Sequence, residues 1–220
     1  MGTIKTGILG NVSGKVGNVV GGTWKGINYL RTMPAGRNNS NSELQVNQRL
    51  KFSTVTKFLQ PINEFIRVGY RAQAVKMTPF NAAFSYNFRN ALTGDFPDYS
   101  INYPFAMVSR GNLTGATNPG CTSTEALKVT LNWETISGNG LSSDTDTAIY
   151  VVFNDSKKEA VYSLNGGLRA DGSMDVNLPS SYAGDTVHCY IAFMTLNSFL
   201  GGQARNSISN SSYAGSVVVA

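Results

Sequence analysis

Residues 127–219 contain a series of short apolar runs separated by turn signals, and this pattern constrains the fold most. In the first run Leu127, Val129, Leu131 and Trp133 alternate with polar residues, which is the period of a half-buried strand. Asn-Gly, Asn-Asp, Asp-Gly and Gly-Gly turn signals separate the further runs, which cover 147–154, 159–164, 173–178, 186–195 and 213–219. We therefore expect a β-sandwich in this part of the chain.

The N-terminal stretch combines glycines with β-branched and aromatic residues. Glycines recur every three or four residues among Val16, Val19, Val20 and Trp24. In a helix each of these glycines would cost about 1 kcal/mol, so strands are favoured. We expect a hairpin in which residues 16–24 pair with 27–33 and the chain turns at Lys25-Gly26.

A helical pattern follows this hairpin. Ser40 and Glu43 form a capping-box pair, and the apolar residues from Val55 to Ile66 recur with the period of a helix. Pro61 removes one backbone donor, so we expect the helix to divide into 42–59 and 61–71.

A second helix is predicted to start after Thr78. Thr78 is a good N-cap, Pro79 suits the first helical position, and Gly94 ends the pattern. One side of this helix carries phenylalanines that we expect to pack on the hairpin or on the preceding helix. These residues are Phe80, Phe84 and Phe88.

The predicted fold class is mainly β with a few helices. Residues 1–118 are expected to form an α+β part, a Gly-rich β-hairpin and helical basic domain, and residues 119–220 a β-sandwich. Residues 111–126 are rich in Gly, Pro, Thr and Ser, and we interpret them as a connection between the two parts.

Charge is distributed unevenly along the chain. Residues 1–118 contain 13 Lys/Arg and 4 Asp/Glu (+9), whereas residues 119–220 contain 5 and 9 (−4). Solvated faces account for scattered basic residues, but two kinds of partner also fit: a nucleic acid, or the acidic half of a neighbouring subunit in head-to-tail packing.

Residues that could carry catalysis are few. His188 is the sole histidine, which excludes His-rich metal sites and two-histidine mechanisms. Cys189 points to the opposite face of the same predicted strand, so the two cannot easily form a nucleophile and base pair. Paired carboxylates for glycoside hydrolysis stay open, because tertiary distance defines them. We expect no enzyme, no cofactor and no metal site.

The opening of the chain has no apolar segment of a secretory signal, and no run approaches the ~20 apolar residues of a membrane span. We expect cytoplasmic synthesis without a signal peptide and no membrane partner. Cys121 and Cys189 are the only thiols, and we expect them to stay reduced.

Two resemblances add to this picture. The C-terminal part resembles an immunoglobulin-like or fibronectin type III-like module, through Trp133 and the segments 149–153 and 190–193. The whole chain is similar to an uncharacterised family of Bacteroidota and prophage-associated proteins. The residues that carry this similarity are Ser13-Gly14-Lys15-Val16-Gly17, Trp24-Lys25-Gly26, Gln48-Arg49 and Val187-His188-Cys189-Tyr190. The resemblance implies relatives and no activity.

These observations favour a non-enzymatic structural or assembly protein, such as a phage or prophage virion component, that forms a homo-oligomer. The residues expected at subunit contacts are Trp24, Lys25, Tyr29, Arg31, Arg49 and Lys51. The alternatives are a nucleic-acid-binding module that uses the basic half, and a carbohydrate- or surface-binding module that uses Trp133 or Tyr182 of the sandwich.

Overall fold

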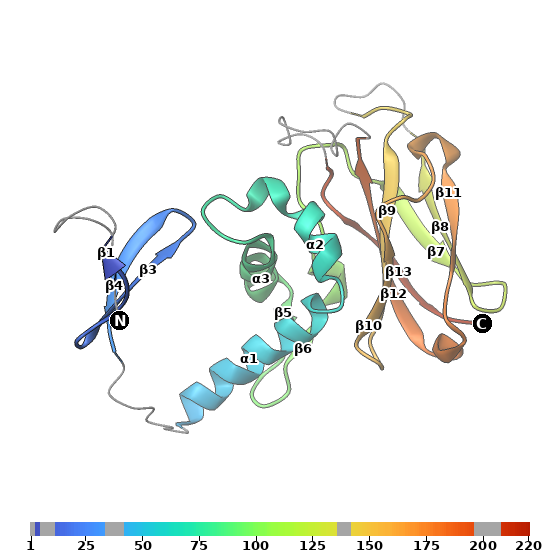
Figure 1. Cartoon of the computed structure of the whole chain (residues 1–220). Coiled ribbons are helices and arrows are strands. Elements are labelled where there is room, and N and C mark those ends of the chain that lie inside the picture. The colour runs from blue at the N-terminus through green and yellow to red at the C-terminus, as the bar shows by residue number, and fades with distance from the viewer. Residues whose placement is uncertain (1–2, 5–11, 34–41, 136–141, 196–207) are drawn as a thin grey trace. The chain divides into compact units, whose positions relative to one another are not determined.

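The computed structural model describes residues 3–4, 12–33, 42–135, 142–195 and 208–220 (Figure 1). The protein is mainly β with three α-helices in this part of the chain, which confirms the predicted fold class. Contacts divide the chain into two compact units, residues 1–45 and 46–220. This division lies in the first turn of a helix, at a different place from the predicted domain boundary at residue 118.

The first unit is an antiparallel sheet. Its strands are β1 (Thr3–Ile4), β2 (Val12–Val16), β3 (Val19–Trp24) and β4 (Ile27–Thr32), in the order β1-β2-β3-β4. The predicted hairpin with its turn at Lys25-Gly26 is confirmed. Both turn residues have positive φ, 47° and 80°, as a two-residue type I′ turn requires, and glycine adopts this conformation without strain.

The second unit begins with helices α1 (Glu43–Leu59), α2 (Asn63–Gly69) and α3 (Pro79–Asn90). The predicted break at Pro61 is confirmed, because α1 ends before it and α2 starts after it. Thr78 is the N-cap of α3, and its hydroxyl accepts a hydrogen bond of 3.1 Å from the backbone N–H of Asn81. Ser40 of the predicted capping box lies outside the described residues.

Two antiparallel sheets make up most of the second unit. One has the order β10-β9-β12-β13 and the other β11-β8-β7; the short pair β5 (Leu92–Thr93) and β6 (Ser100–Ile101) is separate. The strands of the two larger sheets are β7 (Thr117–Thr122), β8 (Lys128–Glu134), β9 (Thr147–Asn154), β10 (Glu159–Ser163), β11 (Ser173–Asn177), β12 (Thr186–Met194) and β13 (Ser212–Val218). The six strands predicted from apolar runs are confirmed.

Strand β7 corrects the interpretation of 111–126 as a connection. Its pairing with β8 shifts register between Thr117 and Gly120, and Asn118 has a positive φ of 44°. Such a bulge leaves one or more residues unpaired, so the strand lacks the regular alternation that sequence patterns detect. The prediction was therefore wrong for residues 117–122.

The two larger sheets pack face to face across a shared apolar core. Trp133 of β8 contacts Phe193 of β12 edge to face, with ring centroids 5.6 Å apart. One buried ion pair lies beside this core: Arg169 Nε is 3.2 Å from Asp146 Oδ2, and the guanidinium stacks 3.7 Å from the centroid of Phe193. The packing fits a sandwich.

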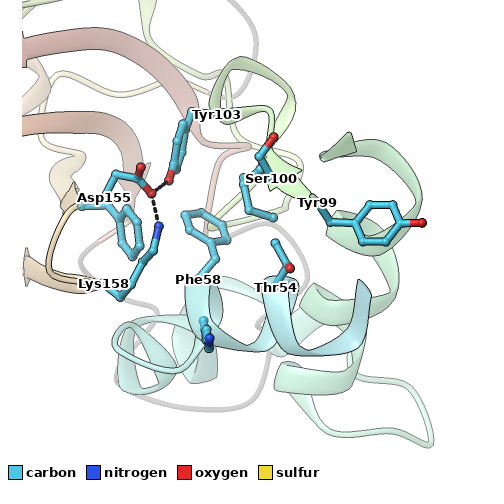
Figure 2. A pocket seen from close by; sticks show the side chains of 10 residues that line it. Thr54, Phe58, Tyr99, Ser100, Tyr103, Asp155 and Lys158 are labelled. Atoms are coloured by element: carbon cyan, nitrogen blue, oxygen red, sulfur yellow. Dashed lines mark hydrogen bonds and ion pairs between the residues drawn. The ribbon is translucent and has the colours of Figure 1, made fainter. Parts of the chain in front are cut away.

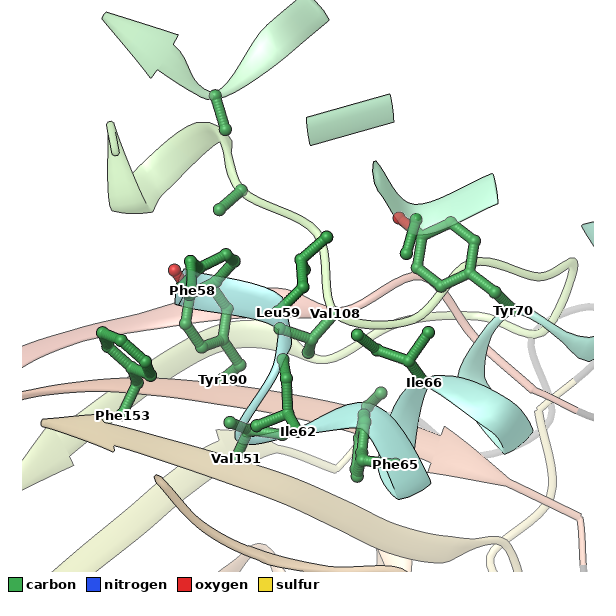
Figure 3. Close-up of a cluster of buried hydrophobic side chains, with 14 of the residues drawn as sticks. Phe58, Leu59, Ile62, Phe65, Ile66, Tyr70, Val108, Val151, Phe153 and Tyr190 are labelled. Carbon is green, nitrogen blue, oxygen red and sulfur yellow. The ribbon is translucent and has the colours of Figure 1, made fainter. Parts of the chain in front are cut away.

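The outer face of the β10-β9-β12-β13 sheet is covered by the helices (Figure 3). Phe58 of α1 lies 5.0 Å from Phe153 of β9, centroid to centroid, and the buried Tyr190 of β12 belongs to the same cluster. Strands β9 and β12 are therefore buried on both faces, and the second unit has three layers: helices, sheet and sheet.

The phenylalanine stripe of α3 packs on the preceding helix, as predicted. Phe84 lies 4.6 Å from Phe52 of α1 and 5.5 Å from Phe88, measured between ring centroids. Phe84 and Phe88 are half-buried at the edge of the core and Phe52 is exposed, whereas Ala83 and Asn87 are the fully buried residues of α3.

Candidate functional site

The first unit presents large side chains to solvent on strands β2, β3 and β4. Trp24 is 46 % exposed, Tyr29 47 % and Leu30 63 %, and every residue of β4 is exposed. We call these side chains the ribbon surface. Its members are Lys15, Val16, Trp24, Lys25, Ile27, Tyr29, Leu30 and Arg31.

Strand register sorts the ribbon surface onto two faces, because alternate residues of a strand point to opposite sides. Lys15 pairs with Val20, Val20 with Arg31, Gly22 with Tyr29 and Trp24 with Ile27. We call the face that these residues share the aromatic face; it carries Lys15, Trp24, Ile27, Tyr29 and Arg31. The opposite, aliphatic face carries Val16 and Leu30.

Gly22 allows Tyr29 to lie close to the backbone of β3. A Cβ atom added at Gly22 would come within 3.1 Å of the Tyr29 ring, a contact so short that the ring would have to shift. Gly22 therefore leaves room for the aromatic side chain of its cross-strand partner. The Tyr29 ring packs over Gly22 and stays partly exposed to solvent.

The ribbon surface is also basic. Lys25 lies at the β3–β4 turn with Nζ 5.7 Å from the centroid of the Trp24 ring, within the range of a cation–π interaction. The described residues of β1 to β4 and their turns include Lys15, Lys25 and Arg31 and no Asp or Glu. Aromatic and basic groups are thus brought together without neutralising carboxylates on these strands.

The structure places four of the six predicted contact residues on the β3–β4 hairpin: Trp24, Lys25, Tyr29 and Arg31. Arg49 and Lys51 are instead on α1, in the second unit. Arg49 is exposed, whereas Lys51 is half-buried with Nζ 5.1 Å from the centroid of the Tyr99 ring. Sequence reasoning missed Ile27 and Leu30, although both interrupt an otherwise polar strand.

A second candidate is a cavity of about 230 Å³ in the second unit (Figure 2). Tyr103, Asp155 and Lys158 line it on one side, where Asp155 accepts hydrogen bonds from the other two residues. The remaining lining residues are Thr54, Lys57, Phe58, Tyr99, Ser100, Ile101 and Phe153. No local sequence signal predicts this group, because Tyr103 and Asp155 are 52 residues apart.

Protonation in this cluster follows from burial and hydrogen bonding. Burial alone would raise the pKa of Asp155, but hydrogen bonds from Lys158 and Tyr103 outweigh it, so the pKa lies below its ordinary value. Burial, reinforced by the bond to Asp155, raises the pKa of Tyr103 well above its ordinary value. The cluster therefore holds an ionised carboxylate and a protonated phenol at neutral pH.

His188 does not line the cavity, but its ring packs against the ring of Tyr103, which does. The two rings stack with centroids 3.6 Å apart, and His188 Nδ1 is 3.0 Å from the Tyr213 hydroxyl. Burial lowers the pKa of His188, which favours the neutral imidazole. The imidazole is half-buried, as expected for a strand histidine, and Cys189 faces the inter-sheet core on the other side. This arrangement anchors Tyr103 to β12.

The remaining expectations from the sequence concern sugar binding, metal binding and the membrane. Trp133 and Tyr182 are buried in the sandwich, so neither ring is available to stack on a sugar. Across the described ranges no three His, Cys, Asp or Glu residues gather as metal ligands would. None of the helices in these ranges is long and apolar enough to cross a membrane.

A protein-family model matches residues 11–215, which include the ribbon surface and the strands of the sandwich as far as the first part of β13. The chain belongs to this family of unknown function (DUF6266). The DUF6266 match therefore covers both compact units, not the sandwich alone. A search of curated proteins found no match.

Proposed function

We propose that this chain is a non-enzymatic structural protein that assembles with copies of itself through the ribbon surface. The assembly that we propose is a phage or prophage particle, in which one surface is used many times. The observation that carries the proposal is the exposure of Trp24, Tyr29 and Leu30 on strands β2 to β4, which include no buried side chain.

Such a sheet gains little stability from its own packing. A small antiparallel sheet needs an apolar face buried against another layer, and each Å² of apolar surface that is buried contributes roughly 25 cal/mol. Gly21 is the only buried residue in the described part of β2 to β4, and it has no side chain to bury. Covering either face would therefore stabilise the ribbon.

Charge favours a second copy of the chain as the partner. The ribbon is basic, and residues 119–220 carry 9 acidic against 5 basic residues. Exposed carboxylates of the second unit include Glu125, Glu134, Glu159 and Asp171. A head-to-tail contact that brings a basic ribbon to an acidic sandwich uses different surfaces of each copy, and repeats without limit unless it closes into a ring.

The experiment is sedimentation velocity of the full chain over a range of concentrations. One variant removes the aromatic face (Trp24→Ser with Tyr29→Ser) and another the aliphatic face (Val16→Ser with Leu30→Ser). Phe105→Ser is the control, because Phe105 is also a large apolar side chain and is 63 % exposed but lies in the second unit. We expect association in the wild type and in the control, and its loss in at least one ribbon variant.

A wild type that stays monomeric at every concentration contradicts the proposal, as do ribbon variants that associate like the wild type. The particle itself is tested by negative-stain electron microscopy of the concentrated protein. Filaments or rings of uniform width support a particle component, whereas amorphous aggregates count against it.

Binding of single-stranded nucleic acid is the second candidate function. It is favoured by the aromatic face, which Trp24 and Tyr29 share with Lys15 and Arg31, since bases stack on aromatic rings while basic groups contact phosphates. Fluorescence anisotropy with a labelled oligonucleotide tests it. Binding must weaken steeply between about 50 and 200 mM salt, and absence of binding at about 50 mM removes the candidate.

A further inference from the structure

The thiols of Cys121 and Cys189 come from opposite sheets of the sandwich. Cys121 is on β7 of the β11-β8-β7 sheet, and Cys189 is on β12 of the other sheet. Both side chains belong to the inter-sheet core, Cys189 as a fully buried member and Cys121 as a half-buried neighbour. Both are free thiols. The sandwich therefore brings together two cysteines that are far apart in the sequence.

Glycine at position 215 makes room for this approach. Gly215 of β13 is the cross-strand partner of Cys189, and a Cβ atom added to it would lie 3.3 Å from Cys121 Sγ. The Cys121 sulfur thus occupies the space above the residue that pairs with Cys189. The two thiols lie close enough for each to shift the pKa of the other.

We propose that Cys121 and Cys189 form a reversible disulfide that ties β7 to β12 across the core of the sandwich. Each residue is anchored on a strand of a different sheet, so the bond would link the two sheets covalently. Two residues on adjacent layers can be bridged when their side chains already lie close together, because little backbone movement is then required. Neither cysteine needs to leave the core.

The two thiols differ in reactivity, which sets the order of the steps. Interaction with the Cys189 thiol lowers the pKa of Cys121, whereas interaction with Cys121 and burial raise the pKa of Cys189. Cys121 is also the more exposed of the two. It is therefore the thiol that an oxidant reaches and the one that reacts first as a thiolate.

The oxidant that we propose is a low-molecular-weight disulfide of the glutathione type. The Cys121 thiolate attacks one of its sulfur atoms, the disulfide bond of the oxidant breaks, and one thiol leaves with a proton. Cys189 then loses its proton and attacks Cys121 Sγ, which expels the second thiol. The chain loses two protons and two electrons, and one oxidant molecule takes them up to become two thiols.

The test is exposure of the folded full chain to oxidised glutathione, followed by unfolding and alkylation of the remaining thiols. We expect both thiols to disappear together, with an intact mass about 2 Da below that of the reduced chain. Peptide mapping should recover one crosslinked pair that contains residues 121 and 189. Reduction should restore both thiols.

Cys121→Ser and Cys189→Ser are the matched controls, each with one thiol left. The Cys121→Ser chain should react at least tenfold more slowly than the wild type, and the Cys189→Ser chain should stop at a mixed disulfide with glutathione. In the wild type the internal disulfide should raise the melting temperature by about 5–10 °C, and the controls should show no such rise.

Three results would overturn the proposal: wild-type chains that keep both thiols after oxidation, a mixed disulfide at Cys121 as the end product, or bonds only between different chains on non-reducing gels. Each is measured on the wild type, so the test stays decisive even where a serine variant folds poorly. None of them bears on assembly through the ribbon surface.

Discussion

The β2–β4 ribbon and the β9–β12 strand pair represent opposite uses of a β-sheet in one chain. On β9 and β12 almost every side chain is buried, because helices cover one face and the β11-β8-β7 sheet covers the other. On the ribbon, β4 has no buried residue at all. The same strand-forming residue types thus build a core in one unit and an open surface in the other.

The comparison distinguishes side chains that stabilise the fold from side chains that are available for contact with a partner. Side chains between two layers contribute to folding through the apolar surface that they remove from water. Side chains of the same kind on an open sheet contribute little until a partner covers them. Substitutions in the two regions should therefore act on different measurements, and the predictions below run from the largest expected effect to the smallest.

The largest effect should come from removing the helical layer. A fragment of residues 119–220 loses the cover over Ile149, Val151 and Phe153, whereas residues 46–220 keep it. We expect the longer fragment to unfold cooperatively in urea and the shorter one to lack a cooperative transition and near-ultraviolet circular dichroism. A cooperative transition for 119–220 would instead support the predicted domain boundary at residue 118.

Single substitutions should show that both faces of the β10-β9-β12-β13 sheet contribute equally to the free energy of unfolding. Phe153 packs toward the helices and Phe193 toward the second sheet, and both are almost fully buried. Each change to Ala should lower the free energy of unfolding by about 3–5 kcal/mol. Phe105→Ala, at an exposed ring, should change it by less than ~0.5 kcal/mol. Urea titration of the three variants measures the difference, and a Phe153 variant as stable as the control contradicts the three-layer core.

Acidification should lower the stability of the second unit. The pKa of His188 is lowered below its ordinary 6.5 mainly by burial, with Asp155 opposing and Lys158 reinforcing the shift. The folded state therefore binds fewer protons than the unfolded state, so stability is complete above about pH 6.5 and falls as the pH drops through the folded pKa. Asp155, with a pKa below its ordinary 3.8, extends the loss to lower pH.

The measurement is the urea midpoint between about pH 7.5 and pH 5, the range in which an ordinary histidine titrates. His188→Gln should flatten the upper part of the profile, because it removes the group that titrates there. Asp155→Asn keeps the histidine and removes the carboxylate that opposes the shift of its pKa, so this variant should keep the upper slope of the profile. A His188→Gln profile that matches the wild type would show that another group governs the pH dependence.

The ribbon should show the smallest effect on folding. Trp24→Ala is expected to shift the urea transition of the chain by less than ~0.5 kcal/mol, since the ring is 46 % exposed. Circular dichroism at a concentration where the chain is monomeric checks this. A loss of several kcal/mol would mean that the Trp24 ring contributes to a folded core, which would remove the contrast between the two regions.

Much of the local structure follows from the sequence. The period-2 run that ends near Trp133 predicts β8, Pro61 predicts the break between α1 and α2, and Lys25-Gly26 predicts the hairpin turn. These features depend on backbone geometry within a few residues, which a sequence pattern records. Strand β7 escaped detection because its bulge interrupts the alternation.

Long-range arrangement was harder to predict. The uninterrupted apolar runs 148–153 and 189–194 are typical of strands buried on both faces, and they are the sequence signal for the helical layer. The cluster of Tyr103, Asp155 and Lys158 has no such signal, since the elements that carry Tyr103 and Asp155 meet only in the folded unit.

The sequence by itself determined the β3–β4 hairpin, six strands of the sandwich, the three helices and the uneven charge of the two halves, because each depends on residue type and short-range spacing. Only the tertiary structure decided that helices and sandwich share one core, that β4 stays open, and that Cys121 meets Cys189 above Gly215. The physical reason is that contacts between distant segments depend on how layers pack, and no local periodicity encodes which layer covers which face.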